Sequence, residues 1–273
     1  MNSSGSESSP AVAAAAAASS SSNHSSNSVP RGLSASSKWA KIMTLQEAMG
    51  DQGEGTMTLK ATTNGRPRLF YFHARGRAEI IRLIFAQAEV EYDDVRFREP
   101  PHAMEDFERL KGEGELPFDQ VPILEVDGMV LAQSQAIVRY IARKHGLMGG
   151  TELDNAFADM VACGTEDLRQ KFTQMIFAKT EQEREQQLQT FSKEVLPRWA
   201  RYFENLLCQR GGDWFLGSRL TYADLAVYDM MSTITWRLPE AFGPFESLRA
   251  HGARVEKLPN IAHWLQTRPD NPL

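Results

Sequence analysis

The sequence predicts an α/β unit followed by an all-helical unit, and three observations support this fold class. Short apolar runs typical of strands lie between residues 69 and 131. After Gly149 and Gly150 the apolar residues recur with helical spacing, and almost no strand pattern remains. A sharp change of composition near residue 60 separates both units from a Ser- and Ala-rich N-terminal stretch. At roughly 100–200 residues per domain, a chain of 273 residues suffices for two modest domains.

The composition excludes several classes of protein. The net charge is −5, the pI is about 5.8 and there is no large basic block, so nucleic acid and anionic membranes are poor candidate partners. The longest small or apolar run, residues 11–18, is too short for a bilayer span of ~20 residues. Two cysteines, Cys163 and Cys208, exclude a disulfide-rich scaffold and a Cys₄ zinc site. They fit a reducing, cytoplasmic environment, and we expect no metal site.

Residues 1–64 are predicted to form a disordered Ser/Ala-rich tail. Almost no large apolar side chain occurs before Leu33, so burial cannot offset the entropy cost of ordering the backbone. The scarcity of acids, with Arg31, Lys38 and Lys41, also resembles an organellar transit peptide slightly. Composition favours the flexible tail, and removing residues 1–60 while following localisation separates the two interpretations.

From residue 68 to 144 the pattern predicts the order β-α-β-(α)-β-β-α. Strands are expected at 69–72, 92–97, 121–126 and 129–131, and helices at 78–86, within 100–118 and after residue 134. Asp127-Gly128 between two apolar runs predicts a two-residue hairpin turn, because glycine tolerates positive φ. Ser134 is the expected N-cap of the helix that carries Ile137, Val138 and Ile141.

The second half of the chain predicts helices. One long amphipathic helix is expected at 152–179, and another at 191–208 with Pro197 as a kink or a helix start. Thr221 followed three positions later by Asp224 has the pattern of a capping box and opens a helix at 225–236. A last helix begins near Pro259 and ends before Arg268.

Four segments of the N-terminal unit together resemble one family. They are Leu-Phe-Tyr-Phe at 69–72, Arg-Gly-Arg-Ala-Glu at 75–79, Val-Pro-Ile-Leu-Glu-Val-Asp-Gly at 121–128 and Gln-Ser at 133–134. In this order and spacing they resemble the sigma class of cytosolic glutathione transferases, which includes glutathione-dependent prostaglandin D synthases and lens S-crystallins. The resemblance covers about residues 68–273. It implies a thioredoxin-like glutathione-binding domain at 65–146 and a helical electrophile-binding and dimerisation domain at 147–273.

The resemblance implies that Tyr71 is the catalytic tyrosine and that Arg77 assists it. Conjugation needs a thiolate, and a phenol that donates a hydrogen bond to sulfur stabilises one. Arg77 falls in the first turn of a helix, where partial positive charge also gathers. Without the flanking motif, Tyr71 is an ordinary half-buried strand residue and Arg77 a surface arginine. No Cys or Ser stands at residues 71–73, which argues against branches that activate the thiol with those residues.

The resemblance also implies a glutathione site. Pro122 is a good position for a cis bond, which lets Val121 pair antiparallel with the cysteinyl backbone of the tripeptide; the alternative is an ordinary trans proline at a strand edge. Gln133 and Ser134 suit the γ-glutamyl carboxylate, unless Ser134 only caps its own helix. Asp167 is expected to reach the amine of glutathione in the partner subunit. The implied glutathione-binding residues are Tyr71, His102, Lys111, Gln120, Val121, Pro122, Gln133, Ser134 and Asp167.

A second set of positions aligns with the electrophile pocket of the family: Ala74, Gly76, Arg169, Gln174, Ala226, Met230 and Leu273. Arg169 and Gln174 replace apolar or aromatic residues of the prostaglandin-synthase branch. Cys163 stands where some relatives have an acid linked to metal modulation, and we expect it to be a small buried residue.

The sequence therefore predicts a homodimeric, cytoplasmic glutathione transferase that conjugates glutathione, its co-substrate, to small hydrophobic electrophiles in detoxification. One alternative is a glutathione-dependent prostaglandin D isomerase, and another is a non-catalytic, crystallin-like ligand-binding member. Glutathione-affinity capture followed by a turnover assay separates the catalytic from the non-catalytic prediction. Phe118, just before the third strand, packs either into a partner subunit or into the core.

Overall fold

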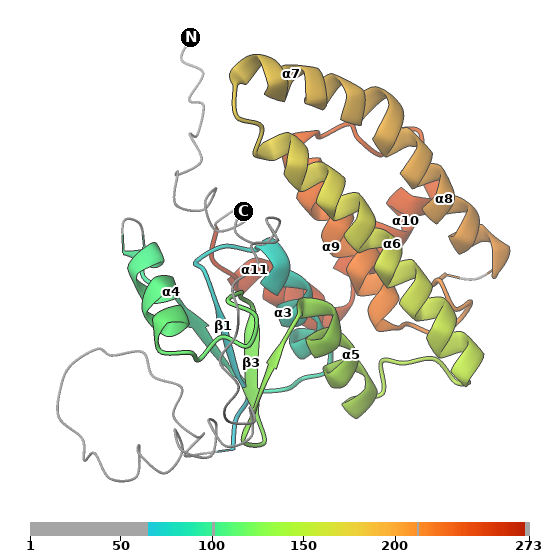
Figure 1. Cartoon of the computed structure of the whole chain (residues 1–273). Coiled ribbons are helices and arrows are strands. Elements are labelled where there is room, and N and C mark those ends of the chain that lie inside the picture. Colours follow the sequence, from blue (N-terminus) through green and yellow to red (C-terminus); the bar gives the residue numbers. More distant parts are fainter. Residues whose placement is uncertain (1–64, 100–101, 212, 271–273) are drawn as a thin grey trace, which may run out of the picture.

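The computed structural model describes residues 65–99, 102–211 and 213–270. Figure 1 shows an α/β unit, built from the first half of this range, beside a larger unit made of helices. The tail predicted at residues 1–64 and the pocket residue Leu273 lie outside the described residues. The predicted fold class is confirmed for the part of the chain that is described.

The N-terminal unit is a four-stranded sheet with helices packed against it. β1 (Arg68–Tyr71), β2 (Asp93–Arg96), β3 (Ile123–Val126) and β4 (Met129–Ala132) lie in the order β2-β1-β3-β4. β1 runs parallel to β2, whereas β3 is antiparallel to both β1 and β4. The helical elements of this unit are η1 (Gly76–Ala78), α3 (Glu79–Gln87), α4 (Ala103–Gly112) and α5 (Ser134–Lys144). This order of elements matches the thioredoxin-like arrangement that the resemblance implies.

The hairpin between β3 and β4 is the one that the sequence predicts. Asp127 and Gly128 have φ values of 50° and 75°. Two successive positive φ angles form the turn whose twist matches that of antiparallel strands. Val126 and Met129 consequently face each other as the last pair of the ladder.

The predicted N-cap of α5 is wrong by one residue. α5 begins at Ser134, and the cap position is Gln133, whose φ is 70°. A positive φ is uncommon for a residue other than glycine, and sequence pattern does not predict it at a glutamine. Gln133 makes no capping hydrogen bond with its side chain, although its backbone carbonyl accepts the N–H of Ala136 over 2.9 Å.

The helical unit contains two helices that the sequence analysis does not predict. Its elements are α6 (Glu152–Ile176), α7 (Glu181–Thr190), the π-helix η2 (Phe191–Val195), α8 (Leu196–Gln209), α9 (Tyr222–Arg237), α10 (Glu246–Glu256) and α11 (Pro259–Thr267). α7 has no buried residue and therefore no apolar stripe to detect. In α10, Gly252 interrupts a short helix with few buried apolar positions. The helix expected at 191–208 begins as η2, and Pro197 lies in the first turn of α8, where its missing N–H is tolerated.

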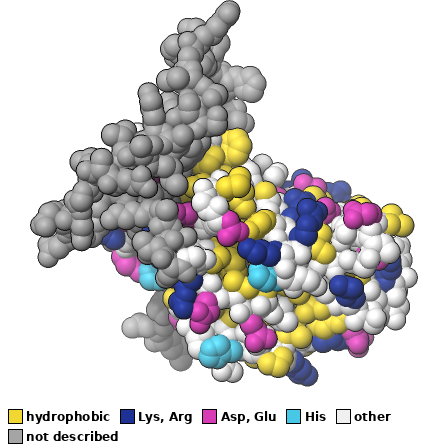
Figure 2. Space-filling model, turned by 90° about the horizontal axis from the view of Figure 1, so that it is seen from below, with side chains coloured by type: hydrophobic (Ala, Val, Ile, Leu, Met, Phe, Trp, Pro, Cys, Tyr) yellow, Lys and Arg dark blue, Asp and Glu magenta, His cyan; other side chains and the backbone are white. Residues whose placement is uncertain are grey.

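The two units share one hydrophobic core. α6 and α9 pack along each other in the middle of the helical unit, and α9 and α11 both contact α3 of the α/β unit (Figure 1). On the face shown in Figure 2, charged side chains of both signs are interspersed with exposed hydrophobic ones. Among the helices described, none combines the length and the apolar character needed to cross a bilayer.

Asp224 anchors the start of α9 in the core. Its carboxylate accepts hydrogen bonds from the backbone N–H groups of Thr221 (2.8 Å) and Phe215 (2.9 Å). The Nε2 atom of His251, on α10, lies 3.1 Å from the same carboxylate. Asp224, Thr221 and His251 are all fully buried. One side chain therefore joins the loop before α9, the helix itself and α10, and the predicted capping role of Asp224 is confirmed.

We predict that Asp224→Ala lowers the free energy of unfolding by about 3–5 kcal/mol, because it leaves buried N–H groups and His251 without their acceptor. Urea unfolding followed by circular dichroism measures the change. Glu185→Ala, an exposed acid on α7, is the matched control and changes stability by less than about 0.5 kcal/mol. A loss below 1 kcal/mol in Asp224→Ala contradicts the anchoring role.

Candidate active site

A groove of about 210 Å³ lies where the α/β unit meets α6. Its walls come from the segment before β3, the start of α5, η1 and the middle of α6. The structure brings six of the predicted site residues together in it, and adds three others. The lining residues are Arg77, Gln120, Val121, Pro122, Gln133, Ser134, Gln135, Glu166 and Gln170.

Tyr71 ends β1, and its hydroxyl is held by the chain that follows. The backbone N–H of Arg77 donates a hydrogen bond to the Tyr71 hydroxyl oxygen over 3.2 Å. Because the oxygen accepts this bond, the phenol keeps its own proton for another acceptor. The positive field at the start of η1 also favours an anion near this oxygen.

Gly76 permits this approach. A Cβ atom at position 76 would lie 2.5 Å from the Tyr71 hydroxyl, and the residue has a φ of 41°. Both the space and the backbone angle therefore require glycine. Gly76 is predicted from the sequence to line the electrophile pocket, and in the structure it lies against the hydroxyl of Tyr71.

The backbone at the groove has the predicted cis geometry. The Val121–Pro122 peptide bond is cis, and both residues are buried just before β3. Across the groove, the side-chain amide N–H of Gln133 donates to the side-chain oxygen Oε1 of Gln120 over 3.5 Å. The start of α5 faces the same space through Ser134 and Gln135. Backbone and amide groups dominate this part of the wall, which suits a ligand with a peptide backbone and a carboxylate.

A row of alternating charges leads from the groove into the helical unit. Arg77 forms an ion pair with Glu166 of α6. Arg169, one turn further on, lies 3.8 Å from Glu166 and 2.5 Å from Asp229 of α9. Arg169 is buried, and its guanidinium is occupied by these two carboxylates.

Several predicted residues lie away from the groove. His102 precedes α4 and contacts Glu105 on the surface, and Lys111 is exposed near the end of α4. Asp167 is exposed on α6 and is not part of the lining. Ala74 lies in the turn after β1, Gln174 is exposed near the end of α6, and Ala226 and Met230 are buried on α9. Whether these side chains share one pocket with Arg169 and Gly76 remains a prediction.

Glu166 is the main residue that sequence reasoning missed. Residues 166 and 167 form an acidic pair, and the sequence analysis selects Asp167; the structure places Glu166 in the groove wall and Asp167 outside it. Helical periodicity carried a usable signal, since Glu166 shares a face of α6 with the groove residue Gln170. The expectation that Cys163 is buried is wrong. Its side chain is exposed and accepts a hydrogen bond from Arg139 at 3.2 Å.

Comparison with known proteins gives the family. Residues 67–143 match the glutathione S-transferase N-terminal domain, and residues 166–268 match a glutathione S-transferase C-terminal domain. The glutathione S-transferase of Plasmodium yoelii yoelii is 43% identical over 198 residues, which cover 72% of this chain and 92% of the relative. The chain belongs to the glutathione S-transferase family. Glutathione is accordingly its co-substrate, and the chain is a glutathione transferase.

The chain is also similar to glutathione transferases of several different kinds. Glutathione S-transferase A1 of Mus musculus is 37% identical and covers 74% of this chain and 88% of its own. The solved structure of rat hPGDS complexed with a quinoline has a TM-score of 0.69 at 30% identity, covering 76% of this chain and all of that one. The Pi-class glutathione S-transferase of Onchocerca volvulus has a TM-score of 0.67 at 31% identity, covering 74% of this chain and 93% of its own.

Asp229 is the most strongly perturbed acid beside the active-site region of the transferase. Complete burial raises the pKa of Asp229 to about 6, although the Arg169 guanidinium opposes this shift. A folded-state pKa above the ordinary value of 3.8 means that the folded state binds the proton more tightly than the unfolded chain. The contribution of this group to stability is therefore fully present below about pH 4 and is lost as the pH rises through 6.

We predict that the stability difference between wild type and Asp229→Asn depends on pH. The free energy of unfolding of wild type minus that of the variant should fall by roughly 2 kcal/mol between pH 4 and pH 6.5, at ~1.4 kcal/mol per unit of pKa shift. Urea unfolding curves at several pH values measure it. A difference that stays constant over this interval shows that Asp229 does not titrate there.

Proposed function

We propose that this glutathione transferase conjugates the glutathione thiolate to small hydrophobic electrophiles, with Tyr71 as the residue that stabilises the thiolate. In this proposal the unit at 65–146 binds glutathione, and the unit at 147–273 binds the electrophile and a second subunit. The observation that carries the proposal is the Tyr71 hydroxyl, buried at the end of β1 with its oxygen already accepting the Arg77 N–H.

Thiol activation is the energetic task. A free thiol has a pKa near ~8.5, and each unit of depression requires ~1.4 kcal/mol of preferential stabilisation of the anion. The Tyr71 proton supplies one charge-assisted hydrogen bond to sulfur. Arg77 adds positive charge, and its ion pair with Glu166 fixes the guanidinium at the groove wall.

The groove supplies the binding energy for the tripeptide. Val121 pairs with the cysteinyl backbone, Gln120 supports that backbone, and Gln133 and Ser134 receive the γ-glutamyl carboxylate at the start of α5. His102 and Lys111 are proposed to approach the glycyl end from α4, and Asp167 of each subunit the amine of glutathione bound to the partner. These contacts hold the glutathione sulfur beside the Tyr71 hydroxyl, so the thiol ionises most readily when glutathione is bound.

The reaction with an aryl halide illustrates the chemistry. The thiol proton leaves for solvent, the thiolate sulfur attacks the carbon that carries chlorine, and a C–S bond forms. The C–Cl bond then breaks, and chloride departs with the bonding electron pair. Ala74, Gly76, Gln174, Ala226, Met230 and Leu273 are the proposed surroundings of the electrophile.

The class within the family is a finer proposal. Resemblance of the motifs, together with the fold shared with rat hPGDS, supports a sigma-like member. Prostaglandin isomerisation is not part of the proposal, because Arg169 puts a buried ion pair with Asp229 where that branch has an apolar residue.

We predict that Tyr71→Phe lowers kcat/KM with an aryl halide about 10- to 100-fold, because one charge-assisted hydrogen bond to sulfur is lost. The pKa of bound glutathione, read from thiolate ultraviolet absorbance, should rise, while glutathione affinity stays within about threefold. Tyr202→Phe, at a half-exposed tyrosine of α8, is the control and retains activity. Equal turnover by Tyr71→Phe and wild type would defeat the proposal.

We propose that the enzyme is a homodimer whose interface includes Phe118. The Phe118 side chain is 62% exposed, so the alternative that it is a core residue is wrong for the single subunit. Phe118 precedes the groove residue Gln120 by two positions. A partner subunit whose Asp167 reaches bound glutathione must pack against the surface beside this groove. An exposed aromatic ring beside a site completed by a partner is a typical interface anchor.

We predict that Phe118→Ala shifts the dimer towards monomer by about tenfold or more in dissociation constant, because the anchoring ring is removed. Sedimentation velocity over a concentration series measures it. Met129→Ala removes a side chain that is 63% exposed on β4 and serves as the control. An unchanged dissociation constant in Phe118→Ala excludes this residue from the interface.

A further inference from the structure

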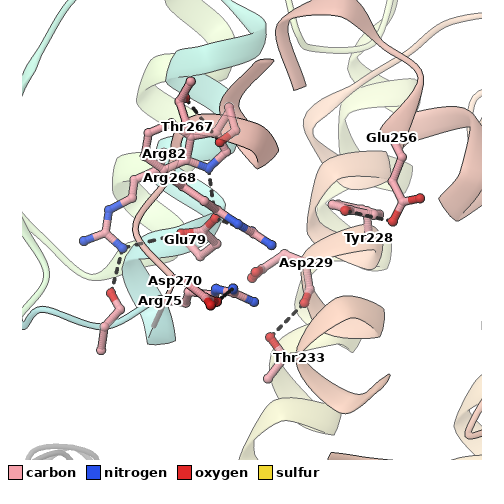
Figure 3. A network of polar contacts seen from close by, with 12 residues as sticks. Arg75, Glu79, Arg82, Tyr228, Asp229, Thr233, Glu256, Thr267, Arg268 and Asp270 are labelled. Atoms are coloured by element: carbon pink, nitrogen blue, oxygen red, sulfur yellow. Dashed lines mark hydrogen bonds and ion pairs between the residues drawn. The ribbon is translucent and has the colours of Figure 1, made fainter. Parts of the chain in front are cut away.

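Arg75 lies where the two units and the C-terminal end of the described chain meet. It stands between Ala74 and Gly76, in the turn that carries the chain from Tyr71 into η1. Figure 3 shows it in a cluster with Glu79 of α3, Asp229 of α9 and the residues that follow α11. Arg75 directly precedes Gly76, whose backbone lies against the Tyr71 hydroxyl.

The buried acids of this cluster are already occupied. Glu79 accepts hydrogen bonds from the indole N–H of Trp264 (2.9 Å) and from Arg268 (2.8 Å), and Arg82 lies 3.5 Å away. Asp229 is paired with Arg169 at 2.5 Å (Figure 3 shows its position opposite Glu79). Neither carboxylate makes a close ion pair with Arg75.

In the described part of the chain, the ion pair of Arg75 is long and its partner, Asp270, is exposed. The Nε atom of Arg75 is buried and has no hydrogen-bond partner. Its Nη2 atom is 3.9 Å from Asp270, beyond hydrogen-bond distance, and the Asp270 side chain is fully exposed. Burial and the neighbouring Arg268 lower the pKa of Arg75, although Glu79, Asp270 and Asp229 oppose this shift. A mostly buried guanidinium that is incompletely paired is stabilised when an anion binds to it.

Glutathione does not supply that anion. Arg75 is not among the residues that line the groove, whereas Gln133 and Ser134, which are proposed to bind the γ-glutamyl carboxylate of the tripeptide, do line it. The neighbours of Arg75 in sequence, Ala74 and Gly76, are proposed from the family resemblance to lie on the electrophile side of Tyr71. An anion on Arg75 therefore belongs to the second substrate.

We propose that Arg75 binds an anionic group, of the carboxylate type, on the electrophile, and that the enzyme prefers electrophiles that carry such a group near the reactive carbon. This inference rests on the proposed function, because it deepens the specificity of the same site. Arg75 acts on specificity and not on the thiolate, since Tyr71 and Arg77 already surround the sulfur position. The exposed Asp270 carboxylate competes weakly with the substrate anion.

The test compares two aryl halides that differ only in one charge, a chlorodinitrobenzoate and its methyl ester. For each variant the measured quantity is the ratio of kcat/KM for the acid to kcat/KM for the ester, corrected for uncatalysed reactivity. Arg75→Gln should lower this ratio about tenfold or more, because one charge-assisted pair is lost. Arg75→Lys should keep part of it. Arg184→Gln, at a surface arginine of α7, is the control and leaves the ratio unchanged.

Asp270→Asn gives an independent reading, because an exposed side chain can be changed without risk to the fold. Removing the competing carboxylate should raise the ratio about two- to threefold, a modest change because solvent screens the pair. An unchanged ratio in Arg75→Gln, or a ratio that does not rise in Asp270→Asn, overturns the inference. Failure of the wild type to turn over either compound overturns the proposed function instead, so the two failures are distinguishable.

Discussion

The close approach of the chain at residue 76 to the Tyr71 hydroxyl is the constraint on which the geometry of the site depends. Glycine is the residue that fits, because any Cβ would overlap the phenol oxygen. The same turn brings the Arg77 N–H to that oxygen and starts the helix that leads to the domain interface. The end of one strand, one glycine and one amide together place the hydroxyl, and the rest of the protein is arranged around it.

The site is completed across the boundary between the two units. The α/β unit supplies Arg77, the cis proline and the start of α5, while α6 supplies Glu166 and Gln170 to the same groove. Ion pairs that cross the boundary, such as Arg77 with Glu166, fix the relative position of the two walls. The buried Glu79 accepts hydrogen bonds from Trp264 and Arg268, and so joins α3 of the α/β unit to the C-terminal end of the helical unit. Docking of the units is therefore part of the active site and not only of the fold.

Local patterns predicted much of the fold and part of the groove. Tyr71 at the end of β1, the Asp127-Gly128 hairpin and the Gln133-Ser134 helix start depend on short stretches of sequence, and short stretches reveal them. Helical periodicity shows that Glu166 shares a face of α6 with Gln170, but not that this face meets Arg77, 89 residues away in the sequence. The exposure of Cys163 depends on how α6 is rotated in the helical unit, and that rotation is set by tertiary packing. α7 escaped prediction because propensity and capping, rather than an apolar face, define it.

The exposure of α7 affects both how far its sequence can diverge and where a label can be attached to the protein. The helix has no fully buried residue, begins with its own Thr180–Glu183 capping box and continues through η2 into α8. Leu188 is its partly buried contact with the core. Apart from Leu188, its sequence is therefore free to diverge as long as good helix formers remain, and we expect most variation among close homologues to be tolerated there. The same outer surface offers an attachment point for a fluorophore or an affinity tag that leaves catalysis undisturbed.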